Sequence, residues 1–277
     1  MPLLKRRSQT PGPDGLTVSA GPGDEGLEYI DFAAHDVPAG ATLDRATQAS
    51  ETALVILGGR CSVHAGDQRF DHLGERDDVW AKTPPYVVLF PPGTPYAVRA
   101  ETELKLVIAA APVGDAAPLP PRVITPDQIA AENRGAGQTY RYIQHLLPPS
   151  ADAARLILVE VYTPAGNWSS FPPHKHDTET PPAESLLEET YYFRVSPPTG
   201  FALQRVYTPD RSVDEPVAPG DGDLVLVPRG YHPVAATPGH DCYYLNVMAG
   251  PTRLWNFQVD PDYAHLMNWA PPAAITR

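Results

Sequence analysis

The stretch from Gly166 to Val195, GNWSSFPPHKHDTETPPAESLLEETYYFRV, carries the strongest information about both fold and function. Within it, His174 and His176 are separated by a single residue. Residues i and i+2 of a β-strand point to the same face of a sheet, so both imidazoles can reach one ion. Imidazole is a common ligand of first-row transition metals. We therefore predict a metal site on a strand, although an isolated pair of this kind is more often simply exposed.

Two further ligand candidates lie downstream of the histidine pair. Glu189 opens the strand-like run 190–193, and His232 follows a predicted strand and the turn Pro-Arg-Gly, which would bring it in from a neighbouring strand. Three imidazoles and one carboxylate suit Zn, Mn, Fe, Co or Ni better than Ca or Mg. Glu184 and Glu188 are alternatives to Glu189. Because strand alternation puts Glu188 and Glu189 on opposite faces, only one of these two can be a ligand.

Proline is unusually frequent, with 34 in a chain of 277 residues. Proline fixes φ and removes a backbone donor, so this density argues against long helices and suits short strands joined by firm turns. Runs of β-branched and aromatic residues bounded by Gly or Pro recur through 15–112 and 153–253, a pattern typical of a sandwich or barrel. We predict an all-β fold with domains at 15–117 and 151–277 and a connector at 118–150.

The connector contains the best helix candidate, TPDQIAAENRG at 125–135. Thr125 is placed to cap a helix whose first residue is Pro126, an acid lies in the first turn, and Gly135 can end it. The segment is equally consistent with a turn that holds one helical piece. We expect a short helical connector between the two domains.

Charge and cysteine content exclude several classes of protein. The formal net charge is -12, and a nucleic-acid binder would need a basic footprint, which the short cluster 5–7 does not supply. Cys61 and Cys242 lie in different predicted domains without CxxC spacing, so a disulfide framework is not expected. No signal-peptide-like core and no apolar run of ~20 residues is present. We predict a cytoplasmic protein without nucleic-acid or membrane partners.

The order of the candidate ligands resembles that of the cupin superfamily, whose small β-barrels hold a metal with two His, one Glu and a later His. The matching pieces here are His174, His176, Glu189 and the segment 222–232, which ends in His232. The spacing departs from the usual cupin pattern in two ways. The gap between His176 and Glu189 is longer, and one residue separates Gly230 from His232 where many cupins have two.

Longer motifs resemble a narrower family, the 5-deoxy-glucuronate isomerases of bacterial myo-inositol catabolism. The resemblance covers nearly the whole chain, through GNWSSFPPHKHD, LEETYYFR, GFALQRVYT, VPRGYHPV, YYLNVMAGPTRLW, LGER (73–76), a PPG strand end and RGAGQTYR (134–141). It implies a bicupin fold of two small antiparallel jelly-roll barrels and a cytosolic sugar-acid isomerase. A related group isomerises 5-keto-4-deoxyuronate.

The resemblance also implies an aldose–ketose isomerisation that converts 5-deoxy-D-glucuronate to 5-dehydro-2-deoxy-D-gluconate. One divalent metal would assist enediolate chemistry, with zinc the first choice and Mn, Fe, Co or Ni as alternatives. A protein group must also carry a proton from C2 to C1. Glu189, Tyr192 and Tyr207 are the candidates, although the two tyrosines could equally be aromatic lining. Asp177 is expected to orient His176.

The substrate carboxylate calls for a cation. We predict Arg205 and Arg229 for this role, because a guanidinium pairs with a carboxylate bidentately, although each could equally be a surface arginine. Lys175 lies between the two histidines and should point away from them.

The first half carries no matching ligand set. Tyr96 stands where the second half has His232, and His64 and His72 are isolated. We expect this domain to be metal-free.

Two other classes of function remain open. The same ligands occur in other metal-dependent cupin enzymes, such as a uronate isomerase or a dioxygenase, and a dioxygenase would consume oxygen. A non-enzymatic sugar-binding bicupin is the second alternative, although such proteins tend to lack the ligands. Assembly into a homo-oligomer is left open.

Overall fold

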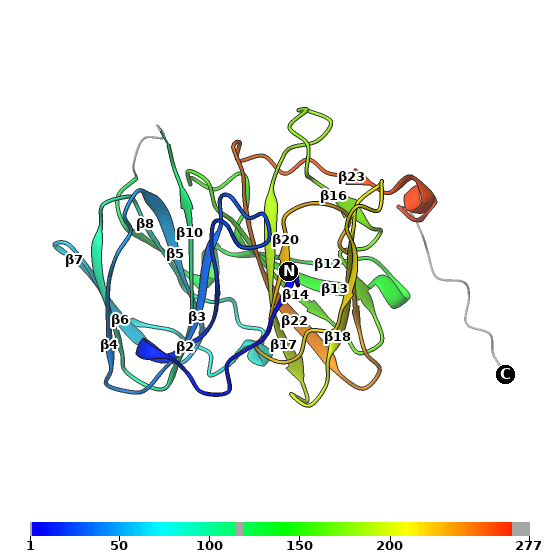
Figure 1. Ribbon diagram of the computed structural model, residues 1–277. Helices are drawn as coiled ribbons and strands as arrows, with labels where there is room; N and C mark the ends of the chain where they lie inside the picture. Colours follow the sequence, from blue (N-terminus) through cyan, green and yellow to red (C-terminus); the bar gives the residue numbers. More distant parts are fainter. Residues whose placement is uncertain (1, 115–118, 268–277) are drawn as a thin grey trace.

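The structure is a computed structural model that describes residues 2–114 and 119–267. Its regular structure in these ranges is β-strand, interrupted by short 3-10 turns, and every strand pairing is antiparallel. The strands form two halves that lie side by side (Figure 1). The predicted all-β class therefore holds. The predicted domain limit at 117/118 and the last ten residues, 268–277, lie outside the described residues.

The first half pairs a six-stranded sheet with a four-stranded sheet. The six-stranded sheet has the order β11-β8-β5-β10-β3-β2 and the four-stranded sheet the order β4-β9-β6-β7. Their bounds are β2 Leu16–Ala20, β3 Asp31–Val37, β4 Thr42–Ala46, β5 Ser50–Gly58, β6 Cys61–Ala65, β7 Gln68–Leu73, β8 Val87–Phe90, β9 Pro95–Ala100, β10 Leu104–Pro112 and β11 Arg122–Ile124, with the 3-10 turns η1 Pro13–Gly15 and η2 Val79–Ala81.

The second half is built around a seven-stranded sheet of order β1-β20-β17-β22-β14-β13-β12. Two smaller sheets complete it, β15-β21-β18-β19 and β16-β23. The bounds are β1 Leu4–Lys5, β12 Ala130–Arg134, β13 Arg141–Leu147, β14 Ile157–Thr163, β15 Trp168–Ser169, β16 His174–Lys175, β17 Glu188–Ser196, β18 Ala202–Tyr207, β19 Asp214–Val217, β20 Leu224–Val227, β21 Val234–Ala236, β22 Asp241–Ala249 and β23 Gln258–Val259, with η3 Pro126–Gln128, η4 Gly137–Thr139 and η5 Pro261–Leu266.

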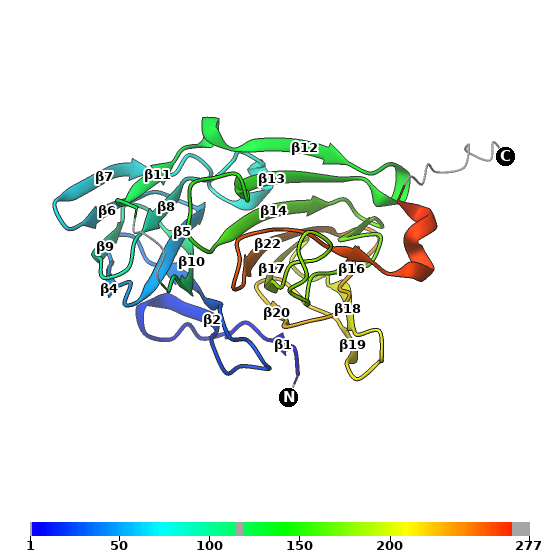
Figure 2. The same cartoon turned by 90° about the horizontal axis from the view of Figure 1, so that it is seen from above.

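Most of the predicted connector is sheet rather than helix. Thr125 and Gln128 form a capping box around a single 3-10 turn, and the backbone is extended again at Ile129. The residues expected to continue the helix instead form β12, which pairs with β13 beside β14 (Figure 2). The expected short helical piece is confirmed as the single turn Pro126–Gln128. The longer alternative, a helix reaching Gly135, does not form, because pairing with β13 supplies the backbone hydrogen bonds that further helical turns would have made.

Strand alternation along β17 divides the core into layers. Tyr191 and Phe193 point into the interior of the second half, together with Val159, Val225 and Tyr244. Tyr192 points the other way, into a cluster that joins the two large sheets, where its ring lies 5.8 Å from that of Phe32. Burial of both faces explains the run of three aromatic residues, 191–193, in the middle of β17.

A buried ion pair joins the two halves. Arg76, from the LGER motif, contacts Glu160 on β14, with Nη2 and Nη1 lying 2.5 and 3.0 Å from the two carboxylate oxygens. The Tyr243 hydroxyl donates to the same carboxylate at 2.7 Å. The side chains of Arg76 and Glu160 are 1% and 0% exposed. Each charge therefore depends on the other, because neither can be solvated by water.

Replacing Arg76 with Ala is expected to lower the free energy of unfolding by about 3–5 kcal/mol, because Glu160 would stay buried without its cation. Chemical denaturation followed by circular dichroism measures the loss. Arg69→Ala is the matched control, since Arg69 pairs with Asp71 on the surface and such pairs contribute about 0–1 kcal/mol. Equal, small losses in both variants would contradict the proposed importance of the buried pair.

Candidate metal centre

Three histidines reach one point inside the second half from two directions. His174 lies on β16 and His176 just beyond it, whereas His232 follows the turn after β20. This turn needs Gly230, whose φ is +94° and where a Cβ would lie 2.6 Å from the Tyr207 carbonyl oxygen. His176 and His232 are 2% and 0% exposed. The ligating nitrogens of the three residues lie within 4.8 Å of one another.

Backbone carbonyls fix the tautomer of all three rings. The Nδ1 atoms of His174, His176 and His232 lie 3.1, 2.7 and 2.9 Å from the carbonyl oxygens of Pro172, Leu187 and Gly230. A carbonyl can only accept, so each Nδ1 carries the proton and donates it, and each Nε2 presents a lone pair. The Nε2 atoms of His176 and His232 are buried without a hydrogen-bond partner. Such atoms fit a metal ion, which would satisfy them.

Glu189 completes the donor set. Its Oε2 lies 3.3 Å from the His176 Nε2 and 3.1 Å from the His232 Nε2. Burial tends to raise the pKa of this carboxyl group, but the His232 and His176 rings, in their protonated form, lower it to about 2. Glu189 in turn raises the pKa of His176 despite its burial, and a bound metal would take the place of these ring protons. Burial and the neighbouring imidazoles lower the pKa of His174 to about 3. The carboxylate is therefore charged and the His174 ring neutral at neutral pH, which are the forms that bind metals.

The two alternative glutamates are committed elsewhere. Glu188 accepts hydrogen bonds of 2.5–2.7 Å from the backbone N–H groups of residues 28–30 in the first half. Glu184 accepts from the Lys175 Nζ at 2.9 and 3.0 Å and from the backbone N–H of Asp177 at 2.7 Å. Of the three acids, only Glu189 faces the imidazoles.

Asp177 does not orient His176 as expected, because the Leu187 carbonyl occupies the His176 Nδ1. The Asp177 carboxylate instead accepts from the Lys175 Nζ at 2.6 Å and from the backbone N–H of Gly230 at 2.9 Å. It thereby ties the strand that carries two histidines to the turn that positions the third.

Neither of the two tyrosines predicted as proton carriers reaches the donor set. Tyr192 lies on the opposite face of β17, in the core between the halves. The Tyr207 hydroxyl donates to Asp260 at 2.7 Å, and its ring packs on that of Tyr231. The structure therefore brings neither tyrosine to the donor set. Strand alternation from Glu189 already placed Tyr192 on the opposite face, whereas the facing of Tyr207 depends on the pairing of its strand with distant segments.

The two arginines predicted to bind the substrate carboxylate also lie elsewhere. Arg205 is exposed and pairs with Asp214 through two hydrogen bonds of 2.7 Å. Its neighbour on β18, Gln204, points inward instead. Arg229 is exposed and lines a separate surface depression beside Ser212. Neither arginine faces the pocket at the donor set.

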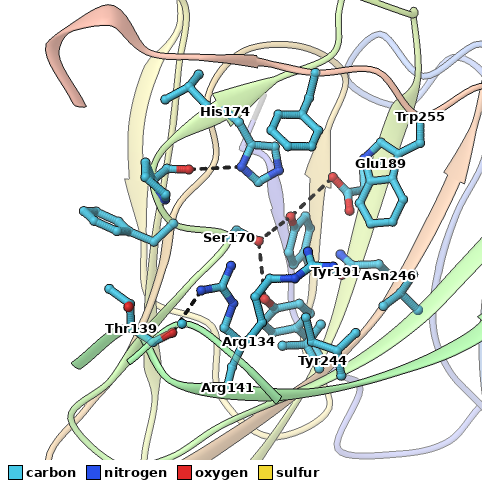
Figure 3. A pocket seen from close by; sticks show the side chains of 18 of the residues that line it. Arg134, Thr139, Arg141, Ser170, His174, Glu189, Tyr191, Tyr244, Asn246 and Trp255 are labelled. Atoms are coloured by element: carbon cyan, nitrogen blue, oxygen red, sulfur yellow. Dashed lines mark hydrogen bonds between the residues drawn. The ribbon is translucent and has the colours of Figure 1, made fainter. Parts of the chain in front are cut away.

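A pocket of about 410 Å³ opens onto the donor set through His174 and Glu189 (Figure 3). The sequence reasoning missed most of its polar lining, namely Arg134, Thr139, Arg141, Ser170, Tyr191, Tyr244, Asn246 and Trp255. Two signals were available. The RGAGQTYR motif contains both arginines, and Tyr191 is two residues from Glu189 on one strand and so shares its face.

Hydroxyl groups lead from the donor set along the pocket wall. The Tyr191 hydroxyl lies 3.3 Å from the Glu189 Oε2, the Ser170 Oγ lies 3.0 Å from the Tyr191 hydroxyl, and the Tyr244 hydroxyl lies 3.3 Å from the Ser170 Oγ. Figure 3 shows Ser170 and Tyr191 between Glu189 and the lower end of the pocket. The arrangement can bind and exchange protons with a polyhydroxylated ligand.

The interior of the first half is apolar at the corresponding place. Tyr96 is buried and stacks on Phe90, with ring centroids 4.5 Å apart. His64 and His72 are exposed, and His72 pairs with Glu101. Within residues 2–114 and 119–267, no second group of three metal-ligating side chains comes as close together as the three histidines. That this half binds no metal stays a prediction.

Two β-sheet halves with one inward-facing set of three imidazoles and a carboxylate define a bicupin with one candidate metal site. An oxalate decarboxylase from Lactobacillus farciminis supports the fold, with a TM-score of 0.60 at 12% identity over 85% of this chain and 80% of that chain. Residues 3–266 match the model of the KduI/IolB family. The chain belongs to the KduI/IolB family.

Relatives within the family are similar over nearly their full length. A 5-deoxy-glucuronate isomerase from Geobacillus thermodenitrificans is 47% identical over 260 residues, which are 94% of each chain. Another from Listeria monocytogenes is 41% identical, over 88% of this chain and 90% of the relative. The crystal structure of an IolB-like protein from Salmonella typhimurium has a TM-score of 0.92 at 43% identity, over 96% of this chain and 99% of that chain.

Purified protein is expected to retain about one equivalent of a divalent transition metal per chain. His174→Ala and His232→Ala each remove one donor and should lower metal affinity by more than roughly 10–100-fold, the loss typical of outer-sphere changes. Elemental analysis after dialysis measures the metal content. His64→Ala, which alters an exposed histidine of the first half, should leave it unchanged. Undiminished metal in both donor variants would rule out this site.

Proposed function

We propose that the chain is a 5-deoxy-glucuronate isomerase, an aldose–ketose isomerase that converts 5-deoxy-D-glucuronate to 5-dehydro-2-deoxy-D-gluconate in myo-inositol catabolism. Relatives that bear this name and are 47% and 45% identical over 94% of the chain support the activity. We further propose that one divalent transition metal, with zinc as the first choice, binds at His174, His176, Glu189 and His232. The observation that supports the metal is that the Nε2 atoms of His176 and His232 are buried without a hydrogen-bond partner, while backbone carbonyls hold the Nδ1 atoms of the same rings.

The bound metal would supply Lewis acidity at the carbonyl and adjacent hydroxyl oxygens of the sugar, which makes the C2 proton easier to remove. The protein's own residues hold the remaining roles. Val159, Val161 and Phe257 give the pocket wall its apolar part. The Tyr191 hydroxyl lies between Glu189 and Ser170, where it can hold a proton beside the reacting oxygens. We assign to it the hydrogen bond to developing charge at O1, and we assign to Glu189 the transfer of the proton from C2 to C1.

The alternative cupin chemistries differ in what they consume. An isomerase needs neither oxygen nor a cosubstrate, whereas a dioxygenase consumes oxygen. In the described residues no helix is long and apolar enough to cross a membrane. A cytoplasmic location stays a prediction.

The first test is a direct assay. We expect the protein to convert 5-deoxy-D-glucuronate under anaerobic conditions, to lose at least about 90% of its rate after chelation, and to regain it when a divalent metal is restored. Proton NMR follows the loss of the aldehyde signal. Turnover that survives complete metal removal would refute the metal-assisted mechanism, and oxygen uptake coupled to turnover would favour a dioxygenase.

The second test uses two neighbouring tyrosines on opposite faces of β17. Tyr191→Phe removes the hydroxyl beside Glu189 and should lower kcat on the order of 100-fold, as expected for loss of a positioned proton donor. Tyr192→Phe alters only the core between the halves and should leave kcat within about twofold. Steady-state kinetics with metal content measured in parallel distinguishes them. If both variants have the same kcat as the wild type, the Tyr191 hydroxyl does not donate a hydrogen bond that contributes to the reaction.

A further inference from the structure

The pocket has a cationic end that the candidate metal ligands do not explain. Arg134 and Arg141 both line it, at the end away from His174 (Figure 3). They belong to β12 and β13, the strands that extend the seven-stranded sheet. The only carboxylate in the described lining is Glu189, which belongs to the donor set. The pocket thus has a metal-binding end and a positively charged end.

Arg141 is half-buried and lacks an acidic partner. Its Nη1 donates to the Thr139 carbonyl at 2.9 Å, and in the described part of the chain no carboxylate lies within ion-pair distance of it. The acid that acts on it from further away, Glu132, is already bonded to Arg134 and His145. Burial lowers the pKa of Arg141. A half-buried guanidinium without a carboxylate partner lowers the stability of the fold unless an anion binds to it.

The loop before Arg141 is shaped around its guanidinium. Gly135 has a φ of +78°, and a Cβ there would lie 2.2 Å from the Thr139 carbonyl oxygen and 2.8 Å from the Arg141 Nη1. Any side chain at position 135 would therefore push the guanidinium aside. This close approach accounts for the glycine in the RGAGQTYR motif, and it makes Arg141 a positioned group rather than a free surface arginine.

Two further donors in the pocket wall have no partner. The Asn246 Nδ2 and the Trp255 Nε1 are buried and make no hydrogen bond. Asn246 is 5% exposed and stands directly across from Tyr191 in the β17–β22 pairing. It lies close enough to the Tyr191 hydroxyl to lower the pKa of that group, but its Nδ2 does not meet hydrogen-bond geometry with any partner. Unsatisfied buried donors beside an unpaired cation indicate a ligand that has both a negative charge and acceptor oxygens.

We propose that Arg141 binds the carboxylate of the sugar-acid substrate, with Arg134 assisting at the pocket rim and with Asn246 and Trp255 donating to the sugar oxygens. The inference rests on the proposed isomerase function and names the group that selects its substrate. In 5-deoxy-D-glucuronate the aldehyde and the carboxylate are at opposite ends of the molecule, as the donor set and Arg141 are in the pocket. A neutral aldose would leave the guanidinium unpaired, which disfavours its binding.

The kinetic test compares an acidic with a neutral substrate. Arg141→Gln should raise KM for 5-deoxy-D-glucuronate roughly 100-fold, as is typical when one member of a desolvated charge pair is removed. The KM for 5-deoxy-D-glucose, which has a hydroxymethyl group in place of the carboxylate, should not change. Arg205→Gln is the matched control and should leave both values alone, since Arg205 pairs with Asp214 outside the pocket. A KM unchanged for the acid, or raised equally for both sugars, would overturn the proposal.

Thermal unfolding excludes a merely structural role. Because Arg141 has no acidic partner, Arg141→Gln should keep or raise the midpoint of unfolding and leave the metal content unchanged. Arg141→Lys keeps the charge without the guanidinium fork and should raise KM by a smaller factor, about tenfold. If both variants unfold at markedly lower temperature than the wild type, Arg141 supports the fold instead and the proposal fails.

Direct binding separates this inference from the proposed function. Calorimetry with D-glucuronate and with D-glucose, on wild-type and Arg141→Gln protein, needs no turnover. If the wild type fails to isomerise 5-deoxy-D-glucuronate but binds D-glucuronate only when Arg141 is present, the carboxylate site stands and the isomerase assignment falls. If the wild type isomerises its substrate and Arg141→Gln has the same KM and the same affinity for D-glucuronate, the isomerase stands and the carboxylate site falls.

Discussion

A carboxylate buried away from water must find hydrogen-bond donors, and Glu188 finds three of them in the backbone of the opposite half. This contact fixes the facing of β17, and with it the facing of Glu189 toward the imidazoles. A second acid makes the reciprocal contact, since Glu51 of the first half accepts from the backbone N–H groups of residues 154–156. Each half therefore holds a loop of the other through one buried carboxylate, and the candidate ligand lies directly beside one of these two anchors.

Backbone groups also satisfy the buried histidine side chains. There the backbone supplies acceptors rather than donors, and each carbonyl sets which ring nitrogen is protonated. The geometry of the donor set thus follows from strand pairing and from the tight turn at Gly230. Asp177 links the segments that carry these histidines through the Gly230 N–H.

The sequence was most informative where function depends on local spacing. The HxH pair, the later His232 and the β-rich architecture follow from periodicity and turn residues, and the family pattern selected Glu189 from three acids. The sequence was least informative about which face of a sheet each side chain lies on. Arg205 points away from the pocket because the phase of its strand depends on pairing with distant segments. Tyr192 points away because it lies three residues after Glu189 on the same strand, which alternation already implied. Arg141 was overlooked because the connector was expected to be helical, whereas β12, β13 and β14 pair as consecutive antiparallel strands that extend the sheet beyond the helix-capping signal at Thr125.

The N-terminal segment, which precedes the first half in the sequence, pairs with the large sheet of the second half. Leu4 and Lys5 form β1, which pairs with β20 at the edge of the seven-stranded sheet. Arg6 then bonds to Asp223, and Arg7 to Asp36, so the same short segment contacts both halves. Cutting the chain in the connector would consequently leave the second half with an exposed, unpaired strand edge, a site prone to pairing with other chains. The second half therefore cannot be treated as a detachable module, because β1 completes the edge of a sheet whose other strands all come from residues 130–249.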